Sequence, residues 1–211
     1  MSIVAVLNTK GGVGKTTIAL NLAVGRALQG RNVLAVDGDR QGSLLAALTN
    51  RGERTPAIAV AQYVDGQALR QQVLRAASYD ENIDILIDVG GRDSSALRAA
   101  LLLADKVITP FLPRSFDVWA LDDMSALLAE ARAIKEVDVY ALLSMADARG
   151  NDNDVASQAI PAGIQLLPVS VGRRKVFADA AGAGLSVLEL PAARDPKAVG
   201  EMQALLAAVF N

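Results

Sequence analysis

The chain contains neither cysteine nor histidine among its 211 residues. Without cysteine, disulfides, thiolate metal sites and cysteine-held iron–sulfur clusters are excluded. Without histidine, no step of any reaction here uses an imidazole as acid, base or metal ligand. Whatever chemistry the protein performs must therefore rest on carboxylates, hydroxyls, lysine and arginine side chains, and the backbone.

Aromatic residues make up only 4% of the chain, although 52% of the residues are hydrophobic, so we expect a core of aliphatic side chains. The formal net charge of −2 argues against attraction of the whole surface to nucleic acid, but it allows a local basic patch. No apolar run approaches the length of a membrane span. Met1-Ser2 leads directly into the first apolar run, so no signal peptide is expected.

Short apolar runs alternate with segments of helical periodicity along the whole chain. The expected strands are 3–7, 32–36, 58–61, 83–88, 106–110, 137–143 and 164–167. The expected helices are 15–29, 43–49, 67–77, 94–103, 116–134, 152–159, 173–181 and 196–209. Continuous apolar strands separated by helices predict a three-layer α/β fold, with a mostly parallel twisted sheet covered by helices on both faces. No linker interrupts the pattern, which indicates a single domain over residues 1–211.

The most informative segment is Lys10-Gly11-Gly12-Val13-Gly14-Lys15-Thr16-Thr17, which follows the first apolar run and opens the first helix. Glycines allow a tight turn whose N–H groups approach phosphate oxygens, and the helix adds the positive end of its dipole. In such a loop Lys15 reaches the β- and γ-phosphates and the Thr16 hydroxyl ligates Mg²⁺. The segment predicts a site for a nucleoside triphosphate.

Two further strands end in carboxylates: Asp37 and Asp39 follow one, and Asp88 ends another, just before Gly90. Taken singly, each aspartate fits a helix cap or a turn equally well. Because ligands of parallel sheets bind at the carboxyl ends of the strands, beside the phosphate loop, these acids suit control of Mg²⁺ and of an attacking water.

The phosphate loop departs from the usual G-x-x-x-x-G-K-[ST] pattern, because Thr9 stands where glycine is expected and Lys10 adds a second lysine. In this it resembles the deviant Walker A ATPases, which include ParA, MinD and the arsenite-pump ATPases. The resemblance implies that Lys10 reaches across a nucleotide-sandwich homodimer to the phosphates held by the other subunit, so that catalysis requires dimerisation on ATP binding. The nitrogenase iron protein of the same family is excluded by the lack of cysteine.

The resemblance also implies roles for the acids. Asp37, Asp39 and Gln41 match the ParA-type Asp-x-Asp-Pro-Gln pattern, in which Asp39 positions the attacking water. Asp88 matches the Walker B aspartate, and Gly90 with Gly91 falls in the γ-phosphate switch. Thr16 is then a direct Mg²⁺ ligand, while Asp37 and Asp88 act through water.

The implied catalytic residues are Lys10, Lys15 and Asp39, and the implied nucleotide-binding residues are Lys10, Gly11, Gly12, Val13, Gly14, Lys15, Thr16, Thr17, Asp37, Asp88 and Gly90. Arg40 and Val89-Gly90 replace family prolines, which leaves the rate and the trigger of hydrolysis open.

Later segments continue the resemblance. Met145-Ala146-Asp147-Ala148-Arg149 is similar to a ParA-type loop, and the basic run before Val176, followed by Gly184-Leu185-Ser186-Val187, is similar to a late ParA segment. The basic run consists of Arg173, Arg174 and Lys175, the candidates for contact with the DNA backbone. A solvated basic turn is the alternative interpretation of this run.

By the same resemblance, the chain is expected to be a cytoplasmic ATPase that uses ATP and Mg²⁺. Its ATP-bound homodimer would bind DNA without sequence preference, associate with the nucleoid, and be stimulated by a ParB-like adaptor or centromere-binding protein. Because the chain begins at the phosphate loop, we do not expect it to act as an autorepressor. The cargo, whether plasmid, chromosome or protein assembly, stays open.

Three alternatives remain. A MinD-like membrane switch would need a C-terminal amphipathic helix with basic residues, but residues 201–211 contain no lysine or arginine, so core packing is expected there and no membrane partner. An ATP-dependent ligase of the dethiobiotin or cobyrinate type fits less well with Lys10 and the Asp37–Asp39 pattern. An ATP-gated switch that tethers proteins without binding DNA is the third.

Overall fold

The computed structural model describes residues 1–91, 93–113, 115–147, 152–191 and 194–211. Its strands are β1 (Ser2–Val6), β2 (Val33–Asp37), β3 (Ala59–Gln62), β4 (Asp84–Asp88), β5 (Lys106–Phe111), β6 (Asp138–Ala146) and β7 (Gln165–Gly172). Its helices are α1 (Lys15–Leu28), α2 (Ser43–Arg51), α3 (Gly66–Tyr79), α4 (Ser95–Leu103), α5 (Ser115–Arg132), α6 (Asp152–Gln158), α7 (Lys175–Gly182), the 3₁₀ turn η1 (Val187–Glu189) and α8 (Pro196–Phe210).

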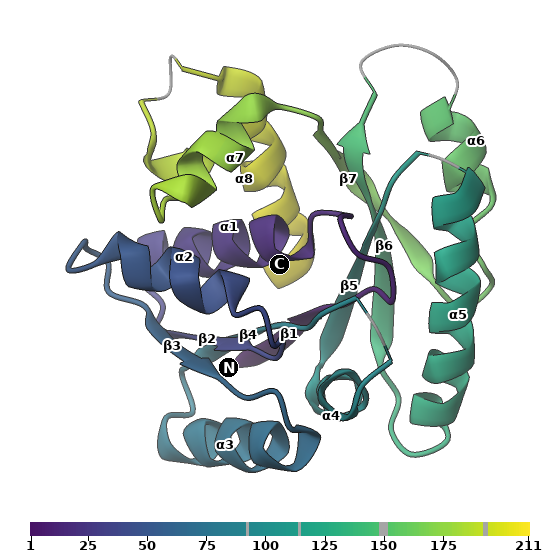
Figure 1. Ribbon diagram of the computed structural model, residues 1–211, viewed down its shortest axis with the longest axis horizontal. Coiled ribbons are helices and arrows are strands. Elements are labelled where there is room, and N and C mark those ends of the chain that lie inside the picture. Colours follow the sequence, from purple (N-terminus) through teal and green to yellow (C-terminus); the bar gives the residue numbers. More distant parts are fainter. Residues whose placement is uncertain (92, 114, 148–151, 192–193) are drawn as a thin grey trace.

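The strands form one seven-stranded sheet in the order β3-β2-β4-β1-β5-β6-β7 (Figure 1). Every neighbouring pair is parallel. Strands and helices alternate along the chain, because a parallel strand can be reached only by a crossover connection. The expected three-layer α/β fold is confirmed.

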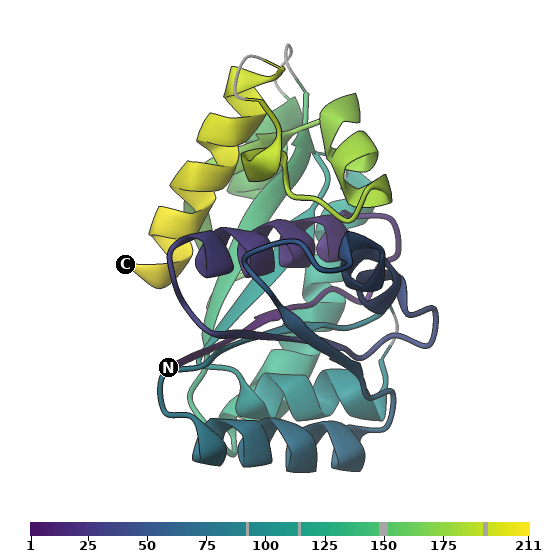
Figure 2. The ribbon, with the colours of Figure 1, turned by 90° about the vertical axis from the view of Figure 1, so that its left-hand side faces the viewer.

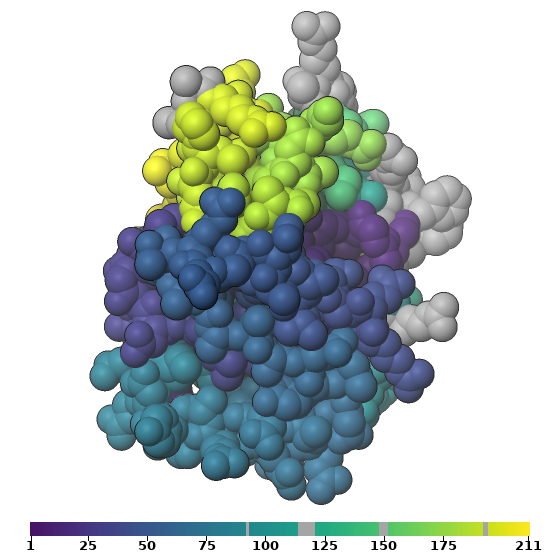
Figure 3. All heavy atoms as spheres, turned by 60° about the vertical axis from the view of Figure 1, so that its left-hand side comes forward, coloured from purple at the N-terminus to yellow at the C-terminus, as the bar shows by residue number. Residues whose placement is uncertain are grey.

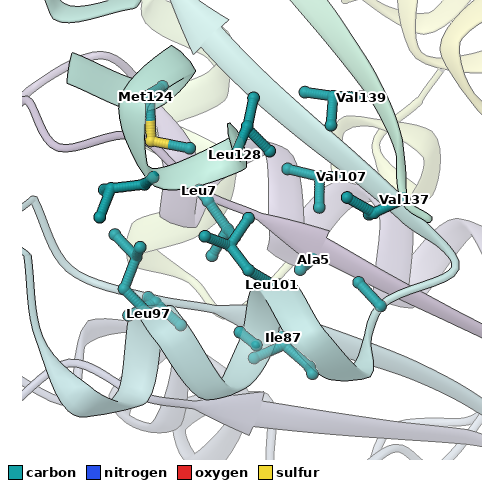
Figure 4. Packing of buried hydrophobic residues seen from close by; sticks show 14 of the residues in the cluster. Ala5, Leu7, Ile87, Leu97, Leu101, Val107, Met124, Leu128, Val137 and Val139 are labelled. Carbon is teal, nitrogen blue, oxygen red and sulfur yellow. The ribbon is translucent and has the colours of Figure 1, made fainter. Parts of the chain in front are cut away.

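Both faces of the sheet are buried, which explains why the strands read as continuous apolar runs. On β1 the side chains alternate: Ala5 and Leu7 belong to one core cluster, and Val4 and Val6 belong to the other. Helices α3, α4 and α5 pack on the first face, where aliphatic side chains such as Leu97 meet the sheet (Figure 4). Helices α1, α2, α7 and α8 pack on the opposite face, so the layers lie above and below the sheet in Figure 2.

The amino end of the sheet holds a buried charge. Asp84 begins β4 with 1% of its side chain exposed, and it accepts hydrogen bonds from Arg26 Nε at 2.9 Å and from Arg31 Nε at 3.2 Å. The Arg26 guanidinium also lies 4.3 Å from the ring centroid of Phe210, at the end of α8. These contacts explain a carboxylate within an apolar strand and join α1, β4 and the C-terminal helix.

Two elements at the far edge of the sheet differ from the sequence-based expectation. Strand β7 continues to Gly172 instead of ending at residue 167, and α7 begins at Lys175 instead of residue 173. Pro168 directly follows the expected end, but β7 is an edge strand, where a residue without an N–H is tolerated. Its pairing with β6 contains two register shifts. Arg173 and Arg174 therefore lie in the turn between β7 and α7.

The C-terminal helix α8 packs its apolar side against the core, where Met202, Leu205 and Val209 are buried. This agrees with the core packing expected for residues 201–211. Within the residues that the structure describes, no helix combines the length and the apolar character needed to cross a membrane.

Candidate functional site

The phosphate loop is held at its start by one amide side chain. Asn8, fully buried, donates from Nδ2 to the carbonyl of Pro110 at 2.8 Å, and its Oδ1 accepts the N–H of Lys10 at 2.8 Å. At the other end of the loop, Gly14 caps α1 with φ = +93°, a conformation that a side chain rarely tolerates. The loop is thus fixed to the end of β5 and delivered directly into the N-terminus of α1.

Lys15 points back into its own loop. Its Nζ donates to the carbonyl of Lys10 at 2.7 Å, and the residue is only 8% exposed. Burial lowers the pKa of Lys15, while the carboxylates of Asp88 and Asp39 act in the opposite direction. A largely desolvated ammonium in a turn of backbone N–H groups is suited to binding phosphate oxygens.

Thr16 and Asp88 form the next contact of the site. The Thr16 hydroxyl donates to Asp88 Oδ2 at 2.6 Å. Burial raises the pKa of Asp88 to about 7, against the lowering effect of this hydrogen bond. Asp88 Oδ1 is buried and has no hydrogen-bond partner among the described residues. A hydroxyl beside a carboxylate with a free buried oxygen fits hydrated Mg²⁺, which is bound through few protein oxygens and keeps several waters.

Asp37 lies beside Asp88 in the β2–β4 register, but its oxygens serve the backbone. Oδ1 accepts the N–H of Asp39 at 3.0 Å, and Oδ2 accepts those of Leu44 and Leu45, each at 2.9 Å. Burial raises the pKa of Asp37, and these hydrogen bonds oppose the shift. Asp37 therefore organises the turn that leads from β2 into α2.

Asp39 lies at the tip of this turn, against the switch segment. Its Oδ1 accepts the N–H of Gln41 at 3.0 Å. A Cβ added at Gly90 would lie only 2.7 Å from Asp39 Cγ, and one added at Gly91 would lie 2.7 Å from the backbone nitrogen of Gly11. Gly90, which stands at one of the family's proline positions, thus lets the backbone after Asp88 approach Asp39, and Gly91 lets it approach the phosphate loop.

Gln62, at the end of edge strand β3, was not identified from the sequence. Its Nε2 donates to the carbonyl of Asp39 at 2.7 Å, and a Cβ added at Gly42 would lie 3.0 Å from the same nitrogen. Gln62 therefore supports the Asp37–Gly42 turn from outside. Gln62 reaches this turn because β3 pairs with β2, and the sequence between the two strands does not indicate that contact.

A cavity of about 290 Å³ opens on the other side of the phosphate loop. Gly14 and Thr17 form one wall, Ser144 and Met145 at the end of β6 form another, and Arg173 contributes from the turn after β7. Met145 has a φ of +51°, the only positive value outside glycine among the described residues. Met145 begins the segment that is similar to a ParA-type loop, but Ala148 and Arg149 of that segment lie outside the described residues.

The three basic candidates have different environments at this cavity. Arg173 and Lys175 are exposed, whereas Arg174 is half-buried and donates from Nη2 to Glu201 Oε1 at 2.5 Å. The charge of Arg174 is therefore balanced by α8. Any basic surface here is formed mainly by Arg173 and Lys175.

Comparisons with known sequences and structures find proteins that are similar to most of this chain. One curated relative, the maintenance of carboxysome distribution protein A of Halothiobacillus neapolitanus, is 29% identical over 96% of this chain and 93% of its own. The chromosome-partitioning ATPase Soj of Thermus thermophilus is 32% identical over 63% of this chain and 62% of its own.

Among solved structures, the septum site-determining protein MinD of Pyrococcus horikoshii, complexed with Mg-ADP, superposes with a TM-score of 0.74 at 19% identity. That match covers all of this chain and 96% of the other, and it establishes the shared fold. The model of the CobQ/CobB/MinD/ParA nucleotide binding domain matches residues 4–187, from β1 to the end of the Gly184–Val187 segment. The chain belongs to this ParA/MinD family of nucleotide-binding ATPases.

Proposed function

We propose that this chain is a ParA-type ATPase that dimerises on binding ATP and partitions or positions a cargo. The observation that carries the proposal is the convergence of Thr16, Asp88 and Asp39 at one end of the sheet: Thr16 bonds Asp88 at 2.6 Å, and Asp39 abuts the switch glycine. A phosphate loop alone indicates that a nucleotide binds. Hydrolysis also needs groups that orient the attacking water and the hydrated Mg²⁺, and Asp39 after β2 and Asp88 at the end of β4 can supply them.

The sheet order supports one orientation for the nucleotide. The strands carrying Asp37 and Asp88 lie on one side of β1, and the ends of β6 and β7, which form the cavity, lie on the other. All strands run parallel, so these groups lie together at the carboxyl ends of the strands. The γ-phosphate would then face Asp39 and Asp88, and the nucleoside would enter the cavity beside Gly14 and Thr17.

Each residue then has a role. Lys15 and the loop N–H groups hold the β- and γ-phosphates, and Asp39 orients the attacking water. Thr16 would ligate Mg²⁺ directly, with Asp88 and Asp37 bonding its waters, and the bound ion neutralises charge on the phosphates. Lys10 would act on the nucleotide of a second subunit, and a ParB-like adaptor would stimulate turnover.

For the DNA step we propose that Arg173 and Lys175 contact backbone phosphates, with each subunit of the dimer contributing one patch. Both side chains are exposed, Arg173 in the turn before α7 and Lys175 at the start of α7. Helix α7 itself lies beside α2 (Figure 3). Named relatives act on chromosomes or on carboxysome distribution, which supports a positioning role and leaves the cargo to experiment. A cytoplasmic, nucleoid-associated protein is the corresponding proposal for location.

DNA retention with ATP, with ADP and without nucleotide, over a salt series, tests this function. We expect wild-type retention to require ATP and to fall steeply with salt, because phosphate contacts release counterions. The double variant Arg173→Glu, Lys175→Glu should lose retention. Arg70→Glu, Arg75→Glu on α3 makes the same charge change on the opposite face of the sheet and should retain DNA.

ATP binding is measured on all three proteins, because Arg173 and Lys175 also line the cavity. Retention by the Arg173, Lys175 variant would move the DNA surface elsewhere. If the wild type binds no DNA under any nucleotide condition, an ATP-gated switch that tethers proteins becomes the better account. The apolar face of α8 is buried in the core, so this helix offers no apolar surface to a membrane in either case.

A further inference from the structure

Glu201, on the C-terminal helix α8, makes three hydrogen bonds to the turn that closes the cavity. Its Oε2 accepts the N–H of Gly172 at 3.0 Å and Arg174 Nε at 3.3 Å, and its Oε1 accepts Arg174 Nη2 at 2.5 Å. The side chains of Arg174 and Glu201 are 26% and 21% exposed. One carboxylate thus fixes both the backbone and a side chain of the turn between β7 and α7.

The turn needs such support. Strand β7 is at the sheet edge, and its pairing with β6 shifts register between Ser144 and Ala146. Beyond that point, the N–H of Arg173 bonds the carbonyl of Ala146 at 3.3 Å. Arg174, the residue before α7, does not cap the helix with its side chain. Glu201 is therefore a principal anchor of the wall that Gly172 and Arg174 present to the cavity.

We propose that Glu201 is a positioning residue for nucleoside recognition, which holds the Gly172–Arg174 wall in the shape that receives the base and ribose. This rests on the proposed function, in which the cavity takes the nucleoside. Glu201 touches no part of the phosphate loop in the contacts above. Its removal should therefore weaken recognition of the nucleoside while leaving recognition of the phosphate chain unchanged.

The experiment compares the affinities of ATP and inorganic tripolyphosphate, both with Mg²⁺, by isothermal titration. Glu201→Gln keeps the shape of the side chain but loses the charge that Arg174 requires. We expect it to weaken ATP binding about tenfold, the loss of one charge-assisted hydrogen bond, with little effect on tripolyphosphate. Asp179→Asn is the matched control, since it breaks another arginine–carboxylate pair of α7, with Arg194 at 3.1 Å, and should change neither affinity.

The outcomes separate the two claims. If wild-type protein binds tripolyphosphate as tightly as ATP, the cavity does not receive the nucleoside and that part of the proposed function is wrong. If the wild type prefers ATP but Glu201→Gln keeps the same preference, Glu201 has no positioning role. An equal loss for both ligands would mean a general effect on the fold, and would also overturn the inference. Thermal melting of each variant identifies that last case.

Discussion

The hydroxyl of Thr16 and the carboxylate of Asp88 are joined by a 2.6 Å hydrogen bond between the first turn of α1 and the end of β4. The two residues are 72 positions apart, and the parallel pairing of β1 with β4 brings them together. The bond connects the phosphate loop to the switch segment that follows Asp88. The carboxylate that ends β4 is therefore held to the first turn of the helix that follows the phosphate loop.

Asp88→Asn should change how stability depends on pH. The pKa of Asp88 is about 7 in the folded protein, raised chiefly by burial from its usual 3.8. Between these values the folded state binds more protons than the unfolded state. The free energy of unfolding should therefore fall as pH rises from about 4 to 7, by at most about 1.4 kcal/mol per pH unit.

Urea denaturation at pH 5 and pH 7.5, without Mg²⁺ or nucleotide, checks this. Relative to wild type, Asp88→Asn should become more stable as the pH rises across that interval. Parallel pH profiles for the two proteins would show that Asp88 keeps an ordinary pKa in the folded state.

Lys15→Ala should abolish ATP binding, because it removes the charge that faces the β- and γ-phosphates from inside the loop. Isothermal titration with ATP and Mg²⁺ measures the effect. Lys197→Ala, an exposed lysine of α8, is the control and should bind normally. Near-normal affinity of Lys15→Ala would contradict the assignment of the loop.

Asp37→Ala should act mainly on stability. It leaves the N–H groups of Asp39, Leu44 and Leu45 without their acceptor, which we expect to cost about 3 kcal/mol of unfolding free energy. The neighbouring change Asp39→Ala removes a partly exposed side chain and should cost much less. Equal losses in chemical denaturation would argue against an organising role for Asp37.

Asp84→Ala should destabilise the fold by about 3 kcal/mol, because it strips the partner from Arg26 and Arg31 at a buried position. Since Asp84 lies at the amino end of the sheet, ATP affinity of the folded variant should be unchanged. Asp80→Ala serves as the control, because it removes a half-buried carboxylate near the same end that accepts hydrogen bonds from Asn32 and from the N–H of Asn82. A loss of ATP affinity without a loss of stability would be inconsistent with this interpretation.

Features encoded in short stretches of sequence were predictable. Alternation of apolar runs and helices gave the layers, and the loop from Lys10 to Thr17, with acids after two strands, indicated the phosphate side of the site. These signals are local, because a strand, a glycine turn and a helix N-terminus occupy consecutive residues.

The other side of the site depends on tertiary packing. Ser144 and Gly172 line the same cavity only because β6 and β7 follow β5 in the sheet, with a shifted register. The Arg174–Glu201 pair spans 27 residues, and without it the basic run looked like three free charges. Asp84 lies within the expected strand 83–88, and the sequence does not indicate its role, since its arginine partners come from α1 and the turn after it.

Asp39→Ala separates ATP binding from turnover, so it shows whether this site hydrolyses ATP with a water that Asp39 positions. Isothermal titration gives the affinity for ATP, and steady-state phosphate release gives the rate. Positioning the water matters mainly in the transition state, so we predict near-wild-type affinity and dimerisation with turnover reduced at least about a hundredfold. Normal turnover by Asp39→Ala would contradict the account.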